Sequence, residues 1–597
     1  MKIKEVEIHN WRSIKDDTIT FEDLMIFIGQ NNHGKSNVLY ALLFFFGEIG
    51  LQDMDFNCNS NELWVEVEFE NLNEEEKKTF KKYATTSNTI KVRKYAQKGE
   101  GFSYRGYLEE PTEDWLKEEK ISDYTNREIA QELSLYVYLP ASGRITKDHF
   151  KQAQKDYIQN NRDAVSFNYT LETSNFLGAK NVAKGIFGDV FFIPSIKKAT
   201  DEFSIKGNSV FNQLYSRVIN KMSESDPIFI EAKDKITELS KILNKTTDDG
   251  QLNQNRPSDL TALEDLLTHE LKSWGSKIDI QITPPNINDI FKIGASVLVD
   301  DGIKTDIERK GDGLQRALIF ALLRAWSKII KQDRDINSEN HENEEFQVTS
   351  TRKASKATYF IFEEPELFLH PQAQKELFST LVALSKEENQ IILCTHSSSF
   401  LKLEYYKSIC IVRKDTIEEG TKILQCTTDL FKDMEEKKRF SLGYWINPDR
   451  SELFFAKKVV LVEGQTDKSV ILLLANKLNV YRYDYTIIDC GSKDSIPQYM
   501  NLLNKFHLKY VVVYDKDHQT NKGIEKRNQA DISSKKIEDS IDVTLGKTVV
   551  LINDIEEESG IGKKVADNKP YFAIDYIESD TYVIPDSFKK KIKEIFS

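Results

Sequence analysis

The sequence has few cysteines, and none of them is spaced to hold a metal ion or to build a disulfide framework. Five occur in 597 residues, without a C-x-x-C pair. They are Cys58, Cys394, Cys410, Cys426 and Cys490. This scatter argues against a zinc ribbon and against a disulfide-stabilised secreted domain. We therefore expect reduced thiols, most of them buried.

Long apolar runs are missing as well. A bilayer span needs about 20 consecutive apolar residues, and the cluster from Leu42 to Phe46 is much shorter. The first residues, M-K-I-K-E, contain no apolar signal region. We expect a soluble, cytoplasmic protein with no membrane contact.

Positive charge is not in excess either, because the net charge is −13. This balance argues against a nonspecific polybasic coat for nucleic acid, and it leaves room for a local basic channel or a metal-assisted site that faces phosphates. Hydrophobic residues make up 40% of the chain. That share is too large for a mainly disordered protein, and at this length it predicts two to four domains.

A phosphate-binding loop is the strongest motif that is present. The stretch G-Q-N-N-H-G-K-S, residues 29–36, follows an apolar run and precedes apolar residues at helical spacing. Such a loop surrounds phosphates with backbone N–H groups, offers Lys35 to the terminal phosphates and offers the Ser36 hydroxyl to Mg²⁺. The predicted nucleotide ligands here are Asn31, Gly34, Lys35, Ser36 and Asn37.

Paired carboxylates follow a second apolar strand. Residues 359–362 are apolar and run into Glu363 and Glu364. In an ATPase, Glu363 would support Mg²⁺ and Glu364 would polarise the attacking water. A further apolar strand, 390–394, leads to His396, which fits a switch residue that reaches the γ-phosphate.

Between these motifs lie two helical segments and a glycine pair. Residues 205–276 carry apolar sets at helical spacing on both sides of a polar loop, so they form either a hairpin packed on its own domain or a protruding dimerisation arm. Gly311 and Gly313 precede an apolar helix expected over 317–326. This stretch loosely resembles the ABC signature loop without its serine, and Gly313 is where a second protomer would meet the γ-phosphate.

The C-terminal part alternates strands and helices. We predict strands at 459–462, 485–489 and 510–514, with helices at 469–478 and 496–506. In a parallel sheet, ligands gather at the C-terminal strand ends. The acids Glu463, Asp467, Asp515 and Asp517 should therefore converge, and such oxygen-only ligands suit Mg²⁺ or Mn²⁺.

Several of these stretches resemble known families. I-H-N-W-R-S, G-Q-N-N-H-G-K-S, E-E-P-E-L-F-L-H-P and C-T-H-S-S are similar to motifs of RecF/SMC-like ABC-type ATPases, and L-V-E-G-Q-T-D and V-V-Y-D-K-D resemble a Toprim domain. The combination resembles the OLD (overcoming lysogenisation defect) family of nucleases. The resemblance implies an α/β fold in which an ABC-type ATPase domain with a helical dimerisation insertion is followed by a Rossmann-like Toprim domain.

The resemblance also implies domain limits and further site residues. The expected parts are 1–204, with an insertion near 110–185, then the helical insertion 205–276, the second ATPase part 277–440 and the Toprim domain 455–597. OLD-type enzymes carry a late acid pair and a lysine, which by resemblance correspond here to Asp554, Glu556 and Lys569, with Glu557 as the alternative to Glu556. The lysine would offset charge on the scissile phosphate.

The function implied by the resemblance is an ATP-binding, Mg²⁺- or Mn²⁺-dependent DNA endonuclease of anti-phage defence, acting as a homodimer or larger assembly. The partner would be a helicase-like protein or a retron reverse transcriptase with its DNA, and the chain does not choose between them. One alternative is a DNA-binding structural ATPase with a non-catalytic Toprim platform. Another is a Toprim primase or topoisomerase. A primase would usually bring zinc-ribbon cysteines, whereas a topoisomerase needs a nucleophilic tyrosine, and 24 tyrosines are present.

Overall fold

The computed structural model describes most of the chain, and contacts divide it into two units. The described residues are 1–58, 60–161, 164–179, 182, 185–195, 209, 211–212, 215–216, 218–219, 226–246, 251–270, 280, 297–322, 324–325, 355, 357–386, 389–431, 433, 435, 448–517, 523–562 and 569–597. The first unit comprises Met1–Ser195, Phe346–Leu367 and Pro371–Ser597, and the second comprises Ile196–Glu345 and Phe368–His370.

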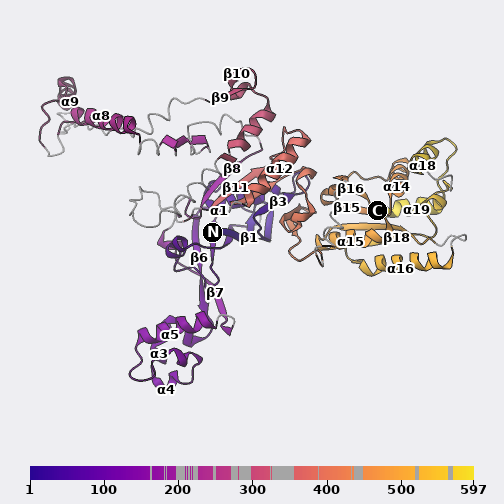
Figure 1. Cartoon of the computed structure of the whole chain (residues 1–597), viewed down its shortest axis with the longest axis horizontal. Coiled ribbons are helices and arrows are strands. Elements are labelled where there is room, and N and C mark those ends of the chain that lie inside the picture. The colour runs from indigo at the N-terminus through magenta and orange to yellow at the C-terminus, as the bar shows by residue number, and fades with distance from the viewer. Residues whose placement is uncertain are drawn as a thin grey trace. The chain divides into compact units, whose positions relative to one another are not determined.

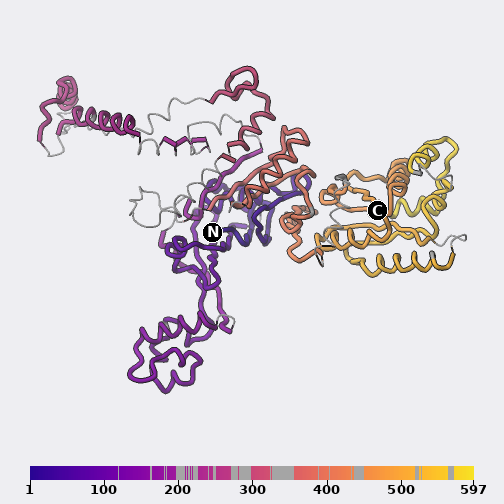
Figure 2. Tube along the Cα trace, in the orientation of Figure 1, coloured from indigo at the N-terminus to yellow at the C-terminus, as the bar shows by residue number. Residues whose placement is uncertain are grey.

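A six-stranded sheet in the first unit carries the phosphate loop. Its order is β14-β13-β3-β12-β11-β8, and all neighbours are parallel except β13 and β14. The strands are β3 (Leu24–Ile28), β8 (Asp189–Ile193), β11 (Thr358–Glu363), β12 (Asn389–Cys394), β13 (Ile409–Arg413) and β14 (Lys422–Gln425). In Figure 2 the indigo segment that holds β3 lies beside the later, salmon-coloured strands. Every residue of β3 and β12 is buried, which explains their continuous apolar runs.

A second, antiparallel sheet has the order β2-β1-β4-β5-β6-β7. Its strands are β1 (Lys2–Trp11), β2 (Ile14–Thr20), β4 (Glu62–Glu70), β5 (Thr89–Gln97), β6 (Gly101–Pro111) and β7 (Phe167–Leu171). In β4, Leu63, Val65, Val67 and Phe69 alternate onto one face, where they are fully buried and share one core with the phosphate-loop helix α1 (Lys35–Phe46). The helix thus lies on the apolar face of this sheet (Figure 1).

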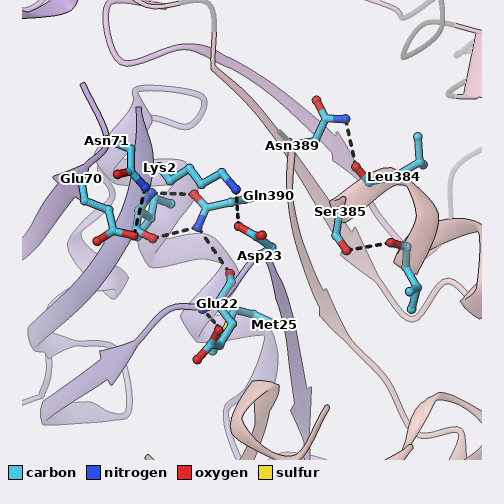
Figure 3. A network of polar contacts seen from close by, with 12 residues as sticks. Lys2, Glu22, Asp23, Met25, Glu70, Asn71, Leu384, Ser385, Asn389 and Gln390 are labelled. Carbon is cyan, nitrogen blue, oxygen red and sulfur yellow. Dashed lines mark hydrogen bonds and ion pairs between the residues drawn. The ribbon is translucent and has the colours of Figure 1, made fainter. Parts of the chain in front are cut away.

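Gln390 joins the two sheets through its side-chain amide (Figure 3). Its Oε1 accepts the Ile3 N–H at 2.5 Å, and its Nε2 donates to the Ile3 carbonyl at 2.8 Å. The pairing of β1 with β4 shifts register between Ile3 and Glu5, so these backbone groups need another partner. A buried glutamine in an apolar strand therefore satisfies main-chain groups of β1 beside its register shift.

Two smaller features complete the ATPase part of the chain. Between β6 and β7 lies an insertion with its own core, which contains Leu116, Leu135, Phe150 and Ala153 and includes α5 (Lys147–Asn160). In the second unit, α8 (Pro227–Leu243) and α9 (Ser258–Glu270) confirm the two helical segments expected within 205–276.

The hairpin of α8 and α9 has little core of its own. Within the described side chains of α8, none is buried, whereas α9 buries Glu264 in an ion pair with Arg256 at 2.6 Å. The predicted helix over 317–326 instead begins at 312 and is described to 322, so Gly313 lies in its first turn and not in a preceding loop.

The C-terminal part forms a parallel sheet of order β16-β15-β17-β18. Its strands are β15 (Lys458–Val462), β16 (Tyr485–Asp489), β17 (Lys509–Asp515) and β18 (Gly546–Leu551), and the last was not predicted. The helices α14 (Gln465–Lys477), α18 (Lys569–Glu578) and α19 (Asp586–Ile595) share one core with the sheet, and α15 (Ile496–Lys505) and α16 (Ile524–Ser540) lie on the other face (Figure 1). The predicted order of strands and helices is thus confirmed.

Other expectations concern cysteines and membranes. Four of the five cysteines are buried, Cys58 is exposed, and none forms a disulfide. Within the described parts of the chain, no helix combines the length and the apolar character that crossing a bilayer requires.

Candidate functional site

Two glycines of the phosphate loop are required by close backbone approach. Gly29 has φ +148°, and a Cβ there would lie 2.1 Å from the carbonyl oxygen of Val412. Gly34 has φ +100°, and its Cβ would lie 2.5 Å from Thr421 Oγ1. Any larger residue would therefore push the loop away from β13 and β14.

Lys35 lies at the start of α1 and is only 6% exposed. Its Nζ donates to the carbonyls of Gly29 at 3.1 Å and Gln30 at 3.0 Å. Burial lowers the pKa of Lys35, and the nearby carboxylates Glu364 and Glu366 oppose this shift. The ammonium is thus held by weak neutral acceptors, which an anionic phosphate would outcompete.

A cavity of about 660 Å³ opens over the loop, a size that accommodates a nucleotide. Of the predicted ligands, those that line it are Asn31, Gly34, Lys35, Ser36, Asn37, Glu364 and His396. The other two predicted ligands are not among the lining residues. Glu363 is the last residue of β11, and Gly313 belongs to the second unit. Seven of the nine residues predicted from the ATPase motifs therefore share one cavity.

Glu364 and His396 lie beside each other in the lining of this cavity. His396 Nε2 lies 3.4 Å from Glu364 Oε1, and Glu364 has a left-handed φ of 45°. The Glu364 N–H donates to the Cys394 carbonyl at 2.9 Å, which fixes this strained turn against the end of β12. Burial, and then the charge of Lys35, lowers the pKa of His396, so its imidazole is neutral at pH 7.

Arg12 is a cavity residue to which the sequence analysis gave no role. Its Nε donates to Asp55 at 2.9 Å, its Nη1 donates to Asn37 at 3.3 Å, and its guanidinium lies 4.7 Å from the ring centre of Tyr40. These contacts aim a permanent positive charge into the cavity. Arg12 belongs to the N-W-R-S stretch that resembles an ATPase motif, but nothing in the sequence indicates that this stretch contacts Asn37 beside the phosphate loop.

In the Toprim part, the predicted acids meet at the C-terminal ends of the strands. Glu463 follows β15, and its Oε1 accepts the N–H of Asp515, the last residue of β17, at 2.8 Å. The helix predicted from residue 469 begins earlier, at Gln465, so that Asp467 lies in the first turn of α14. There its Oδ2 accepts the Gly464 N–H at 2.9 Å, which caps the helix.

The acids interact strongly through their charges. Burial first, and then the charges of Glu463, Asp467, Asp517 and Asp554, raises the pKa of Asp515 to about 9. Burial and the charge of Glu463 likewise raise the pKa of Asp467 to about 7, with a smaller contribution from Glu556. A group of carboxylates that destabilise one another's ionised forms is a site where a divalent cation would relieve repulsion.

The chemistry of this donor set fits Mg²⁺ or Mn²⁺, since all the donors are carboxylate oxygens. In the described part of the chain, however, no three His, Cys, Asp or Glu side chains already lie close enough to hold a metal ion. Binding would therefore draw the carboxylates together.

The predicted second metal position lies beside the first. Asp517 has φ 57° and its N–H donates to the Asn553 carbonyl at 3.2 Å, so the loops after β17 and β18 are adjacent. Asp554 caps the short helix α17 (Ile555–Glu558), which contains Glu556. Lys569 begins α18, and the prediction for its side chain lies outside what the structure describes.

Lys493 is a further residue that the sequence analysis missed. It is 9% exposed, and its Nζ donates to the main-chain carbonyl of Asp515. Nearby, Asp489 at the end of β16 pairs with Arg450 at 2.8 Å and accepts from Gln465 at 3.2 Å. Only the fold brings these side chains to the strand ends that carry the acids.

These features define an ABC-type ATPase followed by a Toprim domain, and comparisons with known families agree. The family described as AAA ATPase domain matches residues 1–401, so the chain belongs to that family. The family described as overcoming lysogenization defect protein-like, TOPRIM domain, matches residues 454–517. The chain thus combines an AAA ATPase domain with an OLD-like Toprim domain.

Individual relatives are distant. The Old nuclease of Escherichia phage P2 is 22% identical over 87% of this chain and 78% of its own length. The OLD nuclease of Thermus scotoductus is 29% identical over 39% of this chain and 47% of its own length, and Endonuclease GajA of Bacillus cereus is 29% identical over 30% and 29%. A solved SMC head bound to the C-winged helix domain of ScpA covers 74% of this chain and 100% of that one, with 13% identity and a TM-score of 0.36.

Proposed function

We propose that this protein is a divalent-metal-dependent DNA endonuclease whose cutting is gated or driven by ATP. The observation that carries this proposal is the group of mutually repelling carboxylates around Asp515 at the C-terminal edge of the Toprim sheet. A structural role would be served better by neutral side chains, because acids buried beside one another cost folding free energy.

Within the Toprim site the acids divide into two sets. Glu463, Asp467, Asp515 and Asp517 would hold one cation, and Asp554 with Glu556 would close the far side around a second. When bound, the cations supply a water of lowered pKa and steady the leaving oxygen. Lys569 would offset the charge that develops on the scissile phosphate.

Within the ATP site, Lys35 and the loop residues Asn31, Gly34 and Asn37 would bind the phosphates, while Ser36 and Glu363 hold Mg²⁺. Glu364 would orient the attacking water, and the neutral His396 would contact the γ-phosphate. Gly313 of a second protomer would complete the site, as the signature loop does in ABC-type ATPases.

The site then requires at least a dimer, and the hairpin supports one. Leu239 and Leu266 are 57% and 62% exposed on α8 and α9, where a second copy would cover them. Replacing both leucines with aspartate should yield monomers in light scattering, whereas Lys233→Asp on the same helix should leave the assembly intact. A wild-type protein that is monomeric at every concentration and still hydrolyses ATP would contradict this assembly.

The OLD-like Toprim match and the similarity to Old nuclease and Endonuclease GajA support a role in anti-phage defence in the cytoplasm, with DNA as the substrate. The accessory partner would be a helicase-like protein or a retron reverse transcriptase with its DNA. Co-purification of the tagged protein from its host before and during phage infection distinguishes these partners.

A second candidate function is a DNA-binding structural ATPase with a non-catalytic Toprim platform. It is favoured by the separation of the carboxylates, since among the described residues no three already form a ligand set. The two functions differ in whether phosphodiester bonds break.

Cleavage of plasmid and linear DNA by the purified protein tests the proposal. The reactions contain Mg²⁺, Mn²⁺ or EDTA, each across a titration of ATP and of a non-hydrolysable analogue. We expect metal-dependent nicking or cutting that changes with nucleotide. Binding without cutting under all conditions would favour the structural ATPase, and a covalent protein–DNA adduct after denaturation would favour a topoisomerase.

A further inference from the structure

Glu366 is a buried carboxylate for which the proposed ATPase reaction has no role. It is the third acid of the E-E-P-E stretch that follows β11, and it is 7% exposed. Burial raises the pKa of Glu366, and the hydrogen bond from His396 opposes that shift. Retaining an ionisable group in such a place costs folding free energy, so its contacts need an explanation.

Those contacts connect the ends of two neighbouring strands. Glu366 Oε1 accepts the main-chain N–H of His396 at 2.6 Å, and the Thr395 hydroxyl also bonds the carboxylate. The other oxygen, Oε2, has no hydrogen-bond partner among the described residues. Through these hydrogen bonds, the Glu366 carboxylate holds the start of the loop after β12.

Gln374, in α12 (Pro371–Ser385), makes a parallel connection one residue further along. Its Nε2 donates to the main-chain carbonyl of Glu366 at 3.4 Å, and its Oε1 accepts from Ser397 Oγ at 2.7 Å. The turn after β11 and the loop after β12 are thus joined at two successive loop residues, His396 and Ser397.

This connection bears on catalysis because the same two segments carry Glu364 and His396. Glu364 precedes Glu366 by two residues and lies 3.4 Å from the His396 ring. A shift of about 1 Å at a reacting group can cost about a hundredfold in rate. Fixing the His396 backbone therefore fixes the distance between the two groups that face the γ-phosphate.

We infer that Glu366 is a positioning residue for ATP hydrolysis, which holds the His396 loop so that His396 and Glu364 keep their mutual geometry. The inference rests on the proposed ATP site. Glu366 is not among the residues that line the cavity over the phosphate loop, and the property that it contributes is a hydrogen-bond acceptor at Oε1, not its charge.

Two substitutions separate acceptor from charge. Glu366→Gln keeps an acceptor oxygen and removes the charge, whereas Glu366→Met keeps the volume and removes the acceptor. For Met we expect kcat for ATP to fall about tenfold to a hundredfold with KM changed less than about threefold, and for Gln we expect most of the wild-type kcat. Glu376→Met, at an exposed position of α12, is the matched control and should behave as wild type.

A double-mutant cycle adds a second readout. Gln374→Met removes the parallel connection, so its effect on kcat should be non-additive with that of Glu366→Met if both hold one loop. A melting experiment shows whether the Glu366→Met protein is folded. If it is not, comparison of Gln374→Met with Glu366→Gln still tests the connection, because the inference predicts loss of kcat in the first variant and not in the second.

The outcomes distinguish this inference from the proposed function. Equal loss of kcat in the Gln and Met variants would overturn the acceptor role, and so would a wild-type kcat in the Met variant. A rise in KM without loss of kcat would overturn it as well, since that result indicates nucleotide binding. Absence of ATP hydrolysis by the wild-type protein, with Lys35→Ala as the reference, would overturn the proposed ATPase and this inference with it.

Discussion

The ATPase sheet and the Toprim sheet place their candidate sites at the same structural position, the C-terminal ends of parallel strands, yet the charges there differ. At the ATP cavity, Arg12 and Lys35 lie near Glu364, and an open volume of about 660 Å³ remains. At the Toprim edge, acids lie beside acids, and the buried Lys493 donates to a main-chain oxygen of Asp515 and not to a described carboxylate. The first arrangement is ready for an anion, and the second requires cations.

The largest expected effect separates the two sites directly. Asp515→Ala should reduce DNA cleavage by at least about a hundredfold, because it removes an acid on which the others converge, and should leave ATP turnover near wild type. Gel assays of plasmid cleavage and phosphate release measure the two activities on the same preparation. Asp539→Ala, at an exposed position of α16, is the matched control. A folded, metal-supplied Asp515→Ala protein that cuts normally would show that the Toprim edge is not the nuclease site.

The converse substitutions act on the ATP cavity. Lys35→Ala should abolish nucleotide binding, while Glu364→Gln should bind ATP and hydrolyse it at least about a hundredfold more slowly, because the water loses its orienting carboxylate. Equilibrium binding of a fluorescent ATP analogue and steady-state turnover distinguish these results. Normal ATP turnover by both variants would show that this cavity is not the ATP site.

A smaller effect is expected at Lys493. Lys493→Met removes the donor to the Asp515 carbonyl and should lower cleavage about tenfold while raising the Mn²⁺ concentration needed for half-maximal rate. Lys493→Arg should recover part of the loss, since it keeps a donor and a charge. Identical metal titrations for wild type and Lys493→Met would contradict a positioning role.

The smallest effect concerns stability and pH. Folding raises the pKa of Asp515 from 3.8 to about 9, so the folded state binds more protons than the unfolded state between these values. The corresponding contribution to the free energy of unfolding is present below about pH 4 and is lost as the pH rises toward about 9. In metal-free buffer, the melting temperature should therefore decline over this range, and Asp515→Asn should flatten the decline.

Added Mn²⁺ provides the complementary measurement. It should raise the melting temperature most at high pH, where the acids are ionised, by mass action on the folded state. No Mn²⁺ stabilisation at any pH would indicate that the separated carboxylates do not come together around a cation, and would support the structural ATPase.

The sequence by itself determined the features that depend on local pattern. The phosphate loop lies between an apolar run and a helical pattern, so its strand, turn and helix follow from neighbouring residues. The same is true of Glu363, Glu364, Glu463 and Asp515, each of which ends an apolar strand or directly follows its end. Burial on both faces of a parallel sheet leaves this signature in the chain.

Only the tertiary structure decided which distant residues share a site. Arg12 reaches Asn37, Glu366 holds the His396 loop, and Lys493 bonds Asp515, and in each case the partner lies at another strand end or in the helix that follows one. Hydrogen bonds of this kind form when strands far apart in the chain become neighbours in a sheet, and single-residue patterns carry no record of that pairing.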